Sequence, residues 1–216
     1  MGGTALHKLY LTPQIRYSED IDFVQINAEP INPILKRLRE RLTFLGTKRV
    51  VKQHIHNNTV IYRFYTEMQP VVPMRLKIEI NTREHINVFE LKEIPYEVKS
   101  SWFAGQCNVT GYEIEELLST KLRALYQRKK GRDLFDLYWA LTQSNIDTEK
   151  LIHCYKIYIK NVVNTPPTQK QFLANMTEKF SDKDFREDIY LLLKQGVSYD
   201  IDTAWELVRK ELVEKI

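Results

Sequence analysis

The strongest constraint on this chain is a change in the spacing of its hydrophobic residues near residue 110. Before that point, short runs alternate apolar and polar residues, as in MRLKIEIN at 74–81, a period typical of strands with one buried face. After it, apolar residues recur with the period of amphipathic helices. We therefore expect an α+β fold, with a small mixed sheet and its helices in a first domain, 1–110, and a C-terminal helical domain, 111–216.

The same spacing predicts the individual elements. A short helical stretch to about residue 11 and an amphipathic helix at 32–46 are expected among strands at 20–26, 48–56, 59–67 and 74–81, with a further strand pair within 86–98. Asn57 and Asn58 are the expected hairpin turn between the second and third strands. Later helices are expected at 112–129, 132–143, 147–160, 168–180, 185–195 and 201–215.

Composition excludes several classes of protein. With 43% hydrophobic and 28% charged residues, the chain has the composition of a soluble globular protein and not of a disordered or fibrous one. It contains no apolar run long enough to span a membrane and no signal-like N-terminus, so we expect no membrane association. Cys107 and Cys154 match neither a disulfide framework nor a zinc site. These features predict a reduced, cytoplasmic protein.

Charge is nearly balanced overall, with 32 basic and 28 acidic residues and a net charge of +4. Its distribution is more informative, because seven basic residues and one acidic residue lie between Lys36 and Lys52. A second basic cluster consists of Arg128, Lys129, Lys130 and Arg132. Such clusters bind phosphates, and they also occur as solvated helix faces. The sequence leaves both interpretations open.

Two aspartates in the first predicted strand indicate a metal site. Asp20 and Asp22 are two residues apart, so their carboxylates lie on one face of the strand and repel each other unless a divalent cation lies between them. Glu79, on the polar face of the 74–81 strand, completes a three-carboxylate cluster if the two strands are neighbours. Oxygen ligands of this kind suit Mg²⁺, which usually retains substrate phosphates in its shell. A surface pair of Glu79 with Lys77 or Arg75 is the alternative.

A glycine pair and two later cations are candidate phosphate ligands. Gly2 and Gly3 enter a helical stretch, where backbone N–H groups can approach a phosphate, although a flexible terminus is the alternative. Lys121 and Arg128 lie on one face of the predicted 112–129 helix, and cations so placed can bind a triphosphate.

Two aspartates follow these cations on the next predicted helix. Asp133 and Asp136 are three residues apart, so they lie on one face of that helix. In a structural interpretation, Asp133 caps the N-terminus of the helix and Asp136 pairs with Arg132 or Arg128. In a functional interpretation, they belong to the same site as Lys121.

Two blocks of the sequence resemble the AbiEii-type, or MenT-like, nucleotidyltransferase toxins of abortive-infection and type IV toxin–antitoxin systems, within the superfamily of DNA polymerase β. The blocks are GGTALHKLYL…RYSEDIDF in 2–23 and KLRALYQRKKGRDLFDLYWAL in 121–141, with the strand of Glu79 between them. In that family a lysine and an arginine precede a K/R-D-x-x-D helix, which matches Lys121, Arg128, Asp133 and Asp136. Relatives also have a strand leading into the Gly-Gly turn, whereas Met1 directly precedes Gly2 here, so the first core strand is expected to be missing or replaced.

The resemblance implies a nucleotidyltransferase-like fold and a metal-dependent enzyme. The enzyme would move a nucleotide from a nucleoside triphosphate to an RNA acceptor, with the 3′ end of a tRNA as a candidate, and pyrophosphate would leave. The implied residues are Asp20, Asp22, Lys121 and Asp133 in catalysis, Gly2, Gly3, Ser18 and Arg128 in nucleotide binding, and Asp20, Asp22 and Glu79 as ligands of Mg²⁺ or Mn²⁺. Glu90 or Glu93 is an alternative third acid. A cognate antitoxin is an implied partner, and its direct contact is left open.

Two rival functions are compatible with these residues. A chain without the first core strand could retain the fold as a non-catalytic binding module. An aminoglycoside-type nucleotidyltransferase shares the core chemistry but modifies a small molecule, and it has no need of basic surfaces that face RNA. The five histidines form no recognisable site, and no serine or cysteine lies in a nucleophile-elbow context, which argues against a metal-independent hydrolase.

Overall fold

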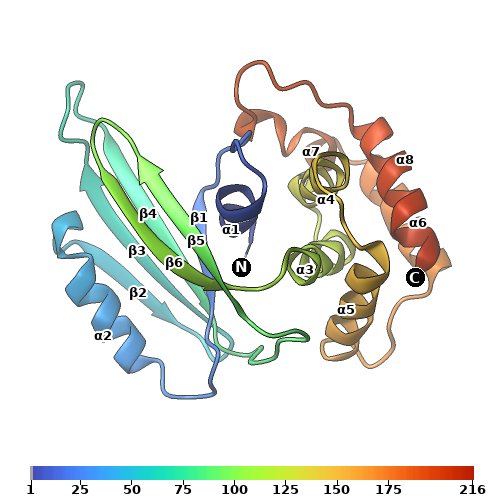
Figure 1. Ribbon diagram of the computed structural model, residues 1–216, viewed down its shortest axis with the longest axis horizontal. Coiled ribbons are helices and arrows are strands. Elements are labelled where there is room, and N and C mark those ends of the chain that lie inside the picture. Colours follow the sequence, from blue (N-terminus) through green and yellow to red (C-terminus); the bar gives the residue numbers. More distant parts are fainter. Residues whose placement is uncertain (1) are drawn as a thin grey trace. The chain divides into compact units, whose positions relative to one another are not determined.

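The protein, described at residues 2–216 by a computed structural model, divides into two compact units (Figure 1). The first, here called the sheet unit, is Ser18–Ile86, and the second, the helical unit, comprises Gly2–Tyr17 and Asn87–Ile216. The small sheets and the helices confirm the expected α+β class. The helical unit includes a hairpin that precedes the change of hydrophobic period at residue 110.

A four-stranded mixed sheet forms the sheet unit, in the order β1-β4-β3-β2. The strands are β1 (Asp20–Val24), β2 (Arg49–Gln53), β3 (Asn57–Tyr65) and β4 (Pro73–Asn81). β1 pairs with β4 in parallel, and the other two pairings are antiparallel. Between β1 and β2 the chain forms helix α2 (Asn32–Arg41) and a 3₁₀ turn, η2 (Thr43–Leu45). The expected strands at 20–26, 48–56, 59–67 and 74–81 are therefore confirmed.

Alternation along the strands directs one face of the sheet toward α2. The fully buried residues of this core are Val60, Tyr62, Ile78 and Ile80, and the apolar stripe of α2 packs against them through Leu35 and Leu38. Figure 1 shows α2 lying along this face, beside β2. Gly46 ends the turn after α2 with a φ of 82°, a conformation that favours glycine. The opposite face of the sheet carries Asp20, Asp22, Lys77 and Glu79.

Two turn and strand predictions were wrong. Asn57 and Asn58 begin β3, where they pair with Asn81 and Ile80 of β4, so the turn is formed by residues 54–56. The further strand pair is β5 (Lys92–Lys99) with β6 (Ala104–Gly111), later than expected. Residues just before β5 have no strand partner because the backbone N–H groups of Val88 and Phe89 donate to the Glu116 carboxylate, at 2.7 and 3.0 Å.

The helical unit begins with a short helix α1 (Gly3–Ala5) and a π-helical turn η1 (Leu6–Tyr10), and β5 and β6 follow. Its longer helices are α3 (Ile114–Gln127), α4 (Gly131–Gln143), α5 (Thr148–Lys160), α6 (Gln169–Phe180) and α8 (Ile201–Glu211), which a turn, η4 (Val213–Lys215), extends. Each matches a predicted helix closely. On α3, the leucines Leu118, Leu122 and Leu125 are fully buried.

One predicted helix, at 185–195, is broken. The chain instead forms α7 (Lys183–Glu187) and a 3₁₀ turn, η3 (Tyr190–Leu192). Leu193 is extended because it forms an isolated β-bridge with Arg16, and the Leu192 carbonyl accepts from the Tyr17 N–H at 2.7 Å. This pairing with a segment far away in sequence outweighs the local helical pattern. Across residues 2–216, no helix is both long and apolar enough to cross a membrane.

Candidate functional site

The carboxylates expected to bind a metal gather on one face of the sheet unit. Asp20 and Asp22 of β1 point to the same side, and the parallel register sets Lys77 opposite Asp20 and Glu79 opposite Asp22. β4 is thus the neighbour of β1, the condition under which Glu79 joins the two aspartates. All four side chains are half-buried.

Lys77 neutralises part of this carboxylate cluster. Its Nζ lies 3.0 Å from Asp20 Oδ2 and 3.0 Å from Glu79 Oε1. Burial lowers the pKa of Lys77, but the hydrogen bonds with Glu79 and Asp20 outweigh burial and raise it, so the ammonium stays charged. The pair of Glu79 with Lys77, the surface alternative left open by the sequence, is therefore present. Lys77 was not among the predicted site residues, although its place on the polar face of the strand was evident.

The donor set of this face suits a divalent ion held by two carboxylates. Within residues 2–216, no group of three or more His, Cys, Asp or Glu side chains is arranged to hold a metal. Mg²⁺ commonly binds through one or two carboxylates, with waters and substrate phosphates in its other positions. Asp20 and Asp22 meet that requirement. Glu79 as a third ligand stays a prediction, and the alternatives Glu90 and Glu93 belong to the helical unit.

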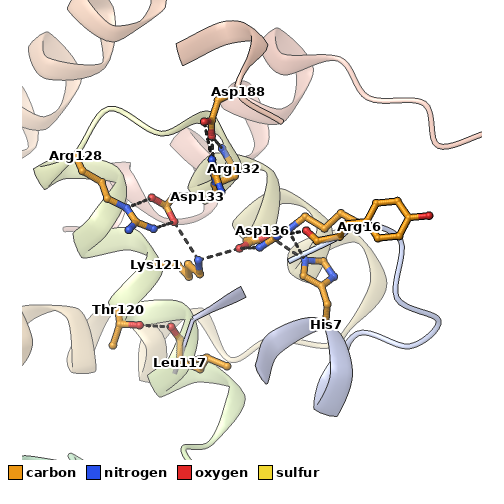
Figure 2. A network of polar contacts seen from close by, with 11 residues as sticks. His7, Arg16, Leu117, Thr120, Lys121, Arg128, Arg132, Asp133, Asp136 and Asp188 are labelled. Atoms are coloured by element: carbon orange, nitrogen blue, oxygen red, sulfur yellow. Dashed lines mark hydrogen bonds and ion pairs between the residues drawn. The ribbon is translucent and has the colours of Figure 1, made fainter. Parts of the chain in front are cut away.

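In the helical unit, Lys121 lies between two buried aspartates (Figure 2). Its Nζ is 3.1 Å from Asp133 Oδ1 and 3.0 Å from Asp136 Oδ2. Arg128 binds the same Asp133 in a bidentate manner, through Nε at 2.6 Å and Nη2 at 2.8 Å. Lys121 is only 5% exposed, and both aspartates are fully buried. The structure thus brings together Lys121, Arg128 and Asp133, as the sequence predicted.

Asp136 connects this cluster to the N-terminal segment. Arg16 donates to its carboxylate through Nε at 2.7 Å and Nη2 at 2.8 Å, and His7 Nε2 lies 2.9 Å from Oδ1. Burial raises the pKa of Asp136, but the charges of Lys121 and Arg16 outweigh burial and hold it well below its usual range. Burial likewise lowers the pKa of Lys121, and the charges of Asp136 and Asp133 raise it above its usual value. Both groups are therefore ionised at neutral pH.

These contacts correct the structural interpretation of the two aspartates. α4 begins at Gly131, and its N-terminus has no side-chain cap, so Asp133 does not serve as one. Asp136 pairs with Arg16 and Lys121 and not, as that interpretation had it, with Arg132 or Arg128. Arg128 binds Asp133. Arg132 binds Asp188 instead, with Nε 2.9 Å from Oδ2.

The glycine pair has a packing role that is visible in the backbone. Gly2 adopts φ 93° and ψ −175°, a region open essentially to glycine alone. A Cβ on Gly3 would lie 1.9 Å from Nη2 of Arg16, so only glycine admits the guanidinium at this point. Backbone conformation at Gly2 and packing at Gly3 therefore both favour glycine. Phosphate binding by Gly2 and Gly3, and by the half-buried Ser18, stays a prediction.

Arg16 and His7 are the residues that sequence reasoning missed. Both lie in the first block of family resemblance, yet their shared partner Asp136 is 120 and 129 residues away in sequence. No local pattern reveals such a pairing. The only signal in the sequence was that both residues lie in the block 2–23, whose glycines and aspartates were predicted to bind the nucleotide and the metal.

The two basic clusters differ in their charge compensation. In the second, in the helical unit, each cation has an acidic partner: Arg128 pairs with Asp133, Lys129 with Asp182, and Lys130 and Arg132 share Asp188. By contrast, the seven basic side chains from Lys36 to Lys52 take part in no ion pair within the described part of the chain. The positive charge of the first cluster is therefore not compensated by ion pairs within the described residues.

Comparison with known proteins supports the resemblance. Residues 1–211 match the family described as the nucleotidyl transferase AbiEii toxin of type IV toxin–antitoxin systems. The fold is similar to that of MenT4, a nucleotidyltransferase toxin from Mycobacterium tuberculosis H37Rv, with 18% identity, a TM-score of 0.70, and coverage of 100% of this chain and 74% of that one. It is also similar to a protein from H. pylori assigned as a nucleotidyltransferase, with 22% identity, a TM-score of 0.52, and coverage of 100% and 87%. No curated protein matches the sequence.

Proposed function

Because this chain belongs to the AbiEii family of nucleotidyltransferase toxins of type IV toxin–antitoxin systems, we propose that it transfers a nucleotide to an RNA acceptor with the help of a divalent metal ion. As a nucleotidyltransferase toxin it uses a nucleoside triphosphate and has a cognate antitoxin. The observation that carries the proposal is the pair of aspartates, Asp20 and Asp22, on one face of β1 with Glu79 in register beside them.

In the proposal, Asp20 and Asp22 hold Mg²⁺ or Mn²⁺. When bound, the ion neutralises charge on the triphosphate and on the leaving pyrophosphate. Glu79 can become a third ligand only if Lys77 releases it, since Lys77 Nζ lies 3.0 Å from Glu79 Oε1. Lys77 supplies the positive charge that these carboxylates need in the absence of a metal, which stabilises the acidic face before substrate binds.

Lys121 and Arg128 are the proposed ligands of the triphosphate. Their charges are only partly compensated, because the network joins three cations, Arg16, Lys121 and Arg128, to two carboxylates, Asp133 and Asp136, and these five groups carry a net charge of +1. A net positive, pre-oriented site of this kind favours a polyanion. Asp133 accepts hydrogen bonds from both Lys121 and Arg128 and so holds them in place.

The acceptor is proposed to be RNA, with the 3′ end of a tRNA as the leading candidate. A hydroxyl of the acceptor attacks the α-phosphorus, a new O–P bond forms, and the bond to the bridging oxygen breaks as pyrophosphate leaves. The unpaired basic side chains between Lys36 and Lys52 support RNA over a small acceptor, because a phosphate backbone needs several uncompensated cations. Modification of a tRNA end would halt translation, as befits a toxin.

A transfer assay tests this proposal. The full chain is incubated with total cellular RNA, Mg²⁺ and each α-labelled nucleoside triphosphate in turn, and labelled RNA is resolved on a sizing gel. We expect label in a discrete RNA class, and at least about a hundredfold less label with Asp20→Asn or Asp22→Asn, since each removes a metal ligand. Glu40→Gln, an exposed change in the same unit, is the matched control. Undiminished transfer by both aspartate variants would reject the metal assignment.

Charge reversal separates RNA from a small-molecule acceptor. Lys36→Glu, Arg37→Glu and Arg41→Glu together place three negative charges on the exposed face of α2. An RNA-modifying enzyme loses most of its transfer activity under this change, whereas an enzyme that modifies an aminoglycoside is indifferent to it. Activity on small acceptors alone would favour the second class.

A further inference from the structure

A polar cavity of about 430 Å³ lies at one end of the sheet unit. We call it the amide pocket, because amide side chains line it together with two imidazoles and a hydroxyl. These polar residues are Gln25, Gln53, Asn58, His54, His85 and Thr82, and the carboxylate residue Glu29 also lines the cavity. Ile31 and Ile55 add apolar surface. The pocket contains none of the residues assigned above to metal or nucleotide binding.

Two of the amide residues are nearly buried, and only the NH2 group of each side chain forms a hydrogen bond. Gln25 is 6% exposed and Asn58 is 3% exposed. Gln25 Nε2 donates to the Glu29 carbonyl at 2.7 Å, and Asn58 Nδ2 donates to Thr82 Oγ1 at 3.3 Å. Within residues 2–216, neither Gln25 Oε1 nor Asn58 Oδ1 accepts a hydrogen bond. Neither oxygen is among the buried side-chain atoms without a hydrogen-bond partner in this part of the chain, so both reach solvent and are open to a ligand.

A second cavity, of about 640 Å³, lies between α2 and β2. We call it the cationic groove, since Lys36, Arg39 and Arg49 line it above an apolar floor that includes Leu35 and Val51. The two cavities adjoin at a hydrogen bond from Gln53 Nε2, which lines the pocket, to Asn32 Oδ1, which lines the groove, at 3.4 Å. Phosphates in the groove would therefore lie next to a group in the pocket.

We propose that the amide pocket binds an unpaired nucleobase of the RNA acceptor while the neighbouring phosphates of that strand lie in the cationic groove. This inference rests on the proposed RNA acceptor and adds a second contact region on it. A nucleobase is a flat apolar ring with hydrogen-bond donors and acceptors along its edge, and single-stranded RNA is recognised through such splayed bases. The side-chain oxygens of Gln25 and Asn58 can accept hydrogen bonds from the amino groups of a base. Ile31 and Ile55 can form apolar contacts with the faces of its ring.

Chemistry favours RNA over an acidic peptide at this surface. An acidic peptide can reach the cations with its carboxylates and the amide oxygens with its backbone N–H groups, but its backbone offers no flat ring with donors along the edge to lie beside Ile31 and Ile55. A strand of RNA satisfies both cavities at once, because it joins anionic phosphates to hydrogen-bonding bases. A free mononucleotide shares the base chemistry, but it spans only part of the groove.

Binding measurements without nucleoside triphosphate or divalent metal isolate this site from catalysis. Fluorescence anisotropy would compare single-stranded RNAs of about ten nucleotides, composed of adenosine, cytidine or uridine, with an abasic strand of equal length. We expect wild-type protein to bind at least one base-bearing strand about tenfold more tightly than the abasic strand. Gln25→Glu and Asn58→Asp, which change few atoms, should reduce that ratio to about one. Lys36→Gln and Arg49→Gln should instead weaken all strands alike.

Gln106→Glu and Asn108→Asp, on the exposed β6, are the matched controls for added negative charge. Equal affinity for base-bearing and abasic strands would overturn the pocket while leaving the RNA acceptor intact. Saturation of the pocket by a 5′-mononucleotide without any effect on RNA affinity would also overturn it. If RNA fails to bind, or if an acidic peptide displaces it, both the proposed base pocket and the proposed RNA acceptor are rejected. The transfer assay reports nucleotide transfer independently of this result.

Discussion

At the scale of single residues, the buried carboxylate of Asp136 is compensated by two cations, Arg16 and Lys121. Asp136 is fully buried and accepts hydrogen bonds from Arg16, while Lys121 forms an ion pair with it at 3.0 Å. Breaking such a pair leaves an uncompensated charge in a medium that solvates it poorly, which costs far more than losing a surface pair. Asp136 is thus a structural support for Lys121, the proposed triphosphate ligand.

Asp136→Asn should destabilise the protein by about 3–5 kcal/mol, because Arg16 and Lys121 lose a buried counter-charge. Chemical denaturation measures this free energy of unfolding. Asp202→Asn is the matched control, since Asp202 is 63% exposed and pairs with Arg186 at the surface. We expect that control to cost less than about 1 kcal/mol. Similar losses in both variants would contradict a buried ionic network.

The same pair has a defined pH dependence. The pKa of Asp136 is lowered in the folded state, so its stabilisation is present above the ordinary carboxylate pKa of about 3.9 and is lost as pH falls below it. The stability difference between wild type and Asp136→Asn should therefore shrink below about pH 4. A difference that grows on acidification would contradict the assigned direction.

Lys77→Met tests the role of the cation among the carboxylates. With the ammonium removed from Asp20 and Glu79, the cluster becomes more negative and should bind Mn²⁺ about tenfold more tightly, or about 1.4 kcal/mol. Isothermal titration calorimetry measures the affinity, and Lys48→Met, which removes an exposed cation of the same unit, is the control. Unchanged Mn²⁺ affinity would mean that these carboxylates do not form the metal site.

At the scale of elements, hydrophobic period predicted most of the fold, because each strand or helix has one face buried in its own unit. Failures arose where distant partners decide local structure. Asn57 and Asn58 carry a turn signal, but pairing with Asn81 and Ile80 makes them strand. Residues 185–195 carry a helical signal, but the bridge between Leu193 and Arg16 interrupts it. The same holds for the site. Its motif residues were predictable from the local sequence, whereas the Arg16–Asp136 pair joins residues 120 positions apart and was not.

Gly131→Ala tests the close approach of α4 and α7. Alanine is usually the better helix former, but a Cβ at Gly131 would lie 2.2 Å from the Phe185 carbonyl oxygen, so the two helices must separate. We expect a loss of about 1–3 kcal/mol in the free energy of unfolding. Gly111→Ala is the control, because its Cβ meets only the end of the Ile94 side chain at 3.1 Å. A stabilised Gly131→Ala variant would show that helix propensity outweighs this contact.

At the scale of the whole molecule, charge is distributed unevenly over two compact units. The sequence contains two basic clusters that look equally suited to RNA. The structure separates them, because the cluster at 128–132 is paired with Asp133, Asp182 and Asp188 while the cluster at 36–52 has no ion pair within residues 2–216. Spacing in the sequence could not reveal this difference, since the acidic partners Asp182 and Asp188 lie on or beside a distant helix.

Salt dependence should reflect that difference. Each phosphate contact adds about 0.7 to the slope of log affinity against log salt concentration for single-stranded nucleic acid. Combined Lys36→Gln, Arg39→Gln and Arg49→Gln should therefore lower the magnitude of the slope for RNA by about 2. Lys129→Gln with Lys130→Gln should change the slope less, because Lys129 already pairs with Asp182 and Lys130 with Asp188. Equal effects of both sets would contradict the proposed RNA surface.

In the proposed function, Asp20 and Asp22 hold a divalent ion that is required for binding a nucleoside triphosphate. Thermal unfolding with each of the four triphosphates, with and without Mg²⁺, tests it most directly, because a ligand that binds the folded state raises the melting temperature. We predict stabilisation by at least one triphosphate that requires Mg²⁺ and is lost in Asp20→Asn and Asp22→Asn, with Glu40→Gln behaving as wild type. Stabilisation that is absent in the wild type, or that persists in both aspartate variants, would contradict the claim.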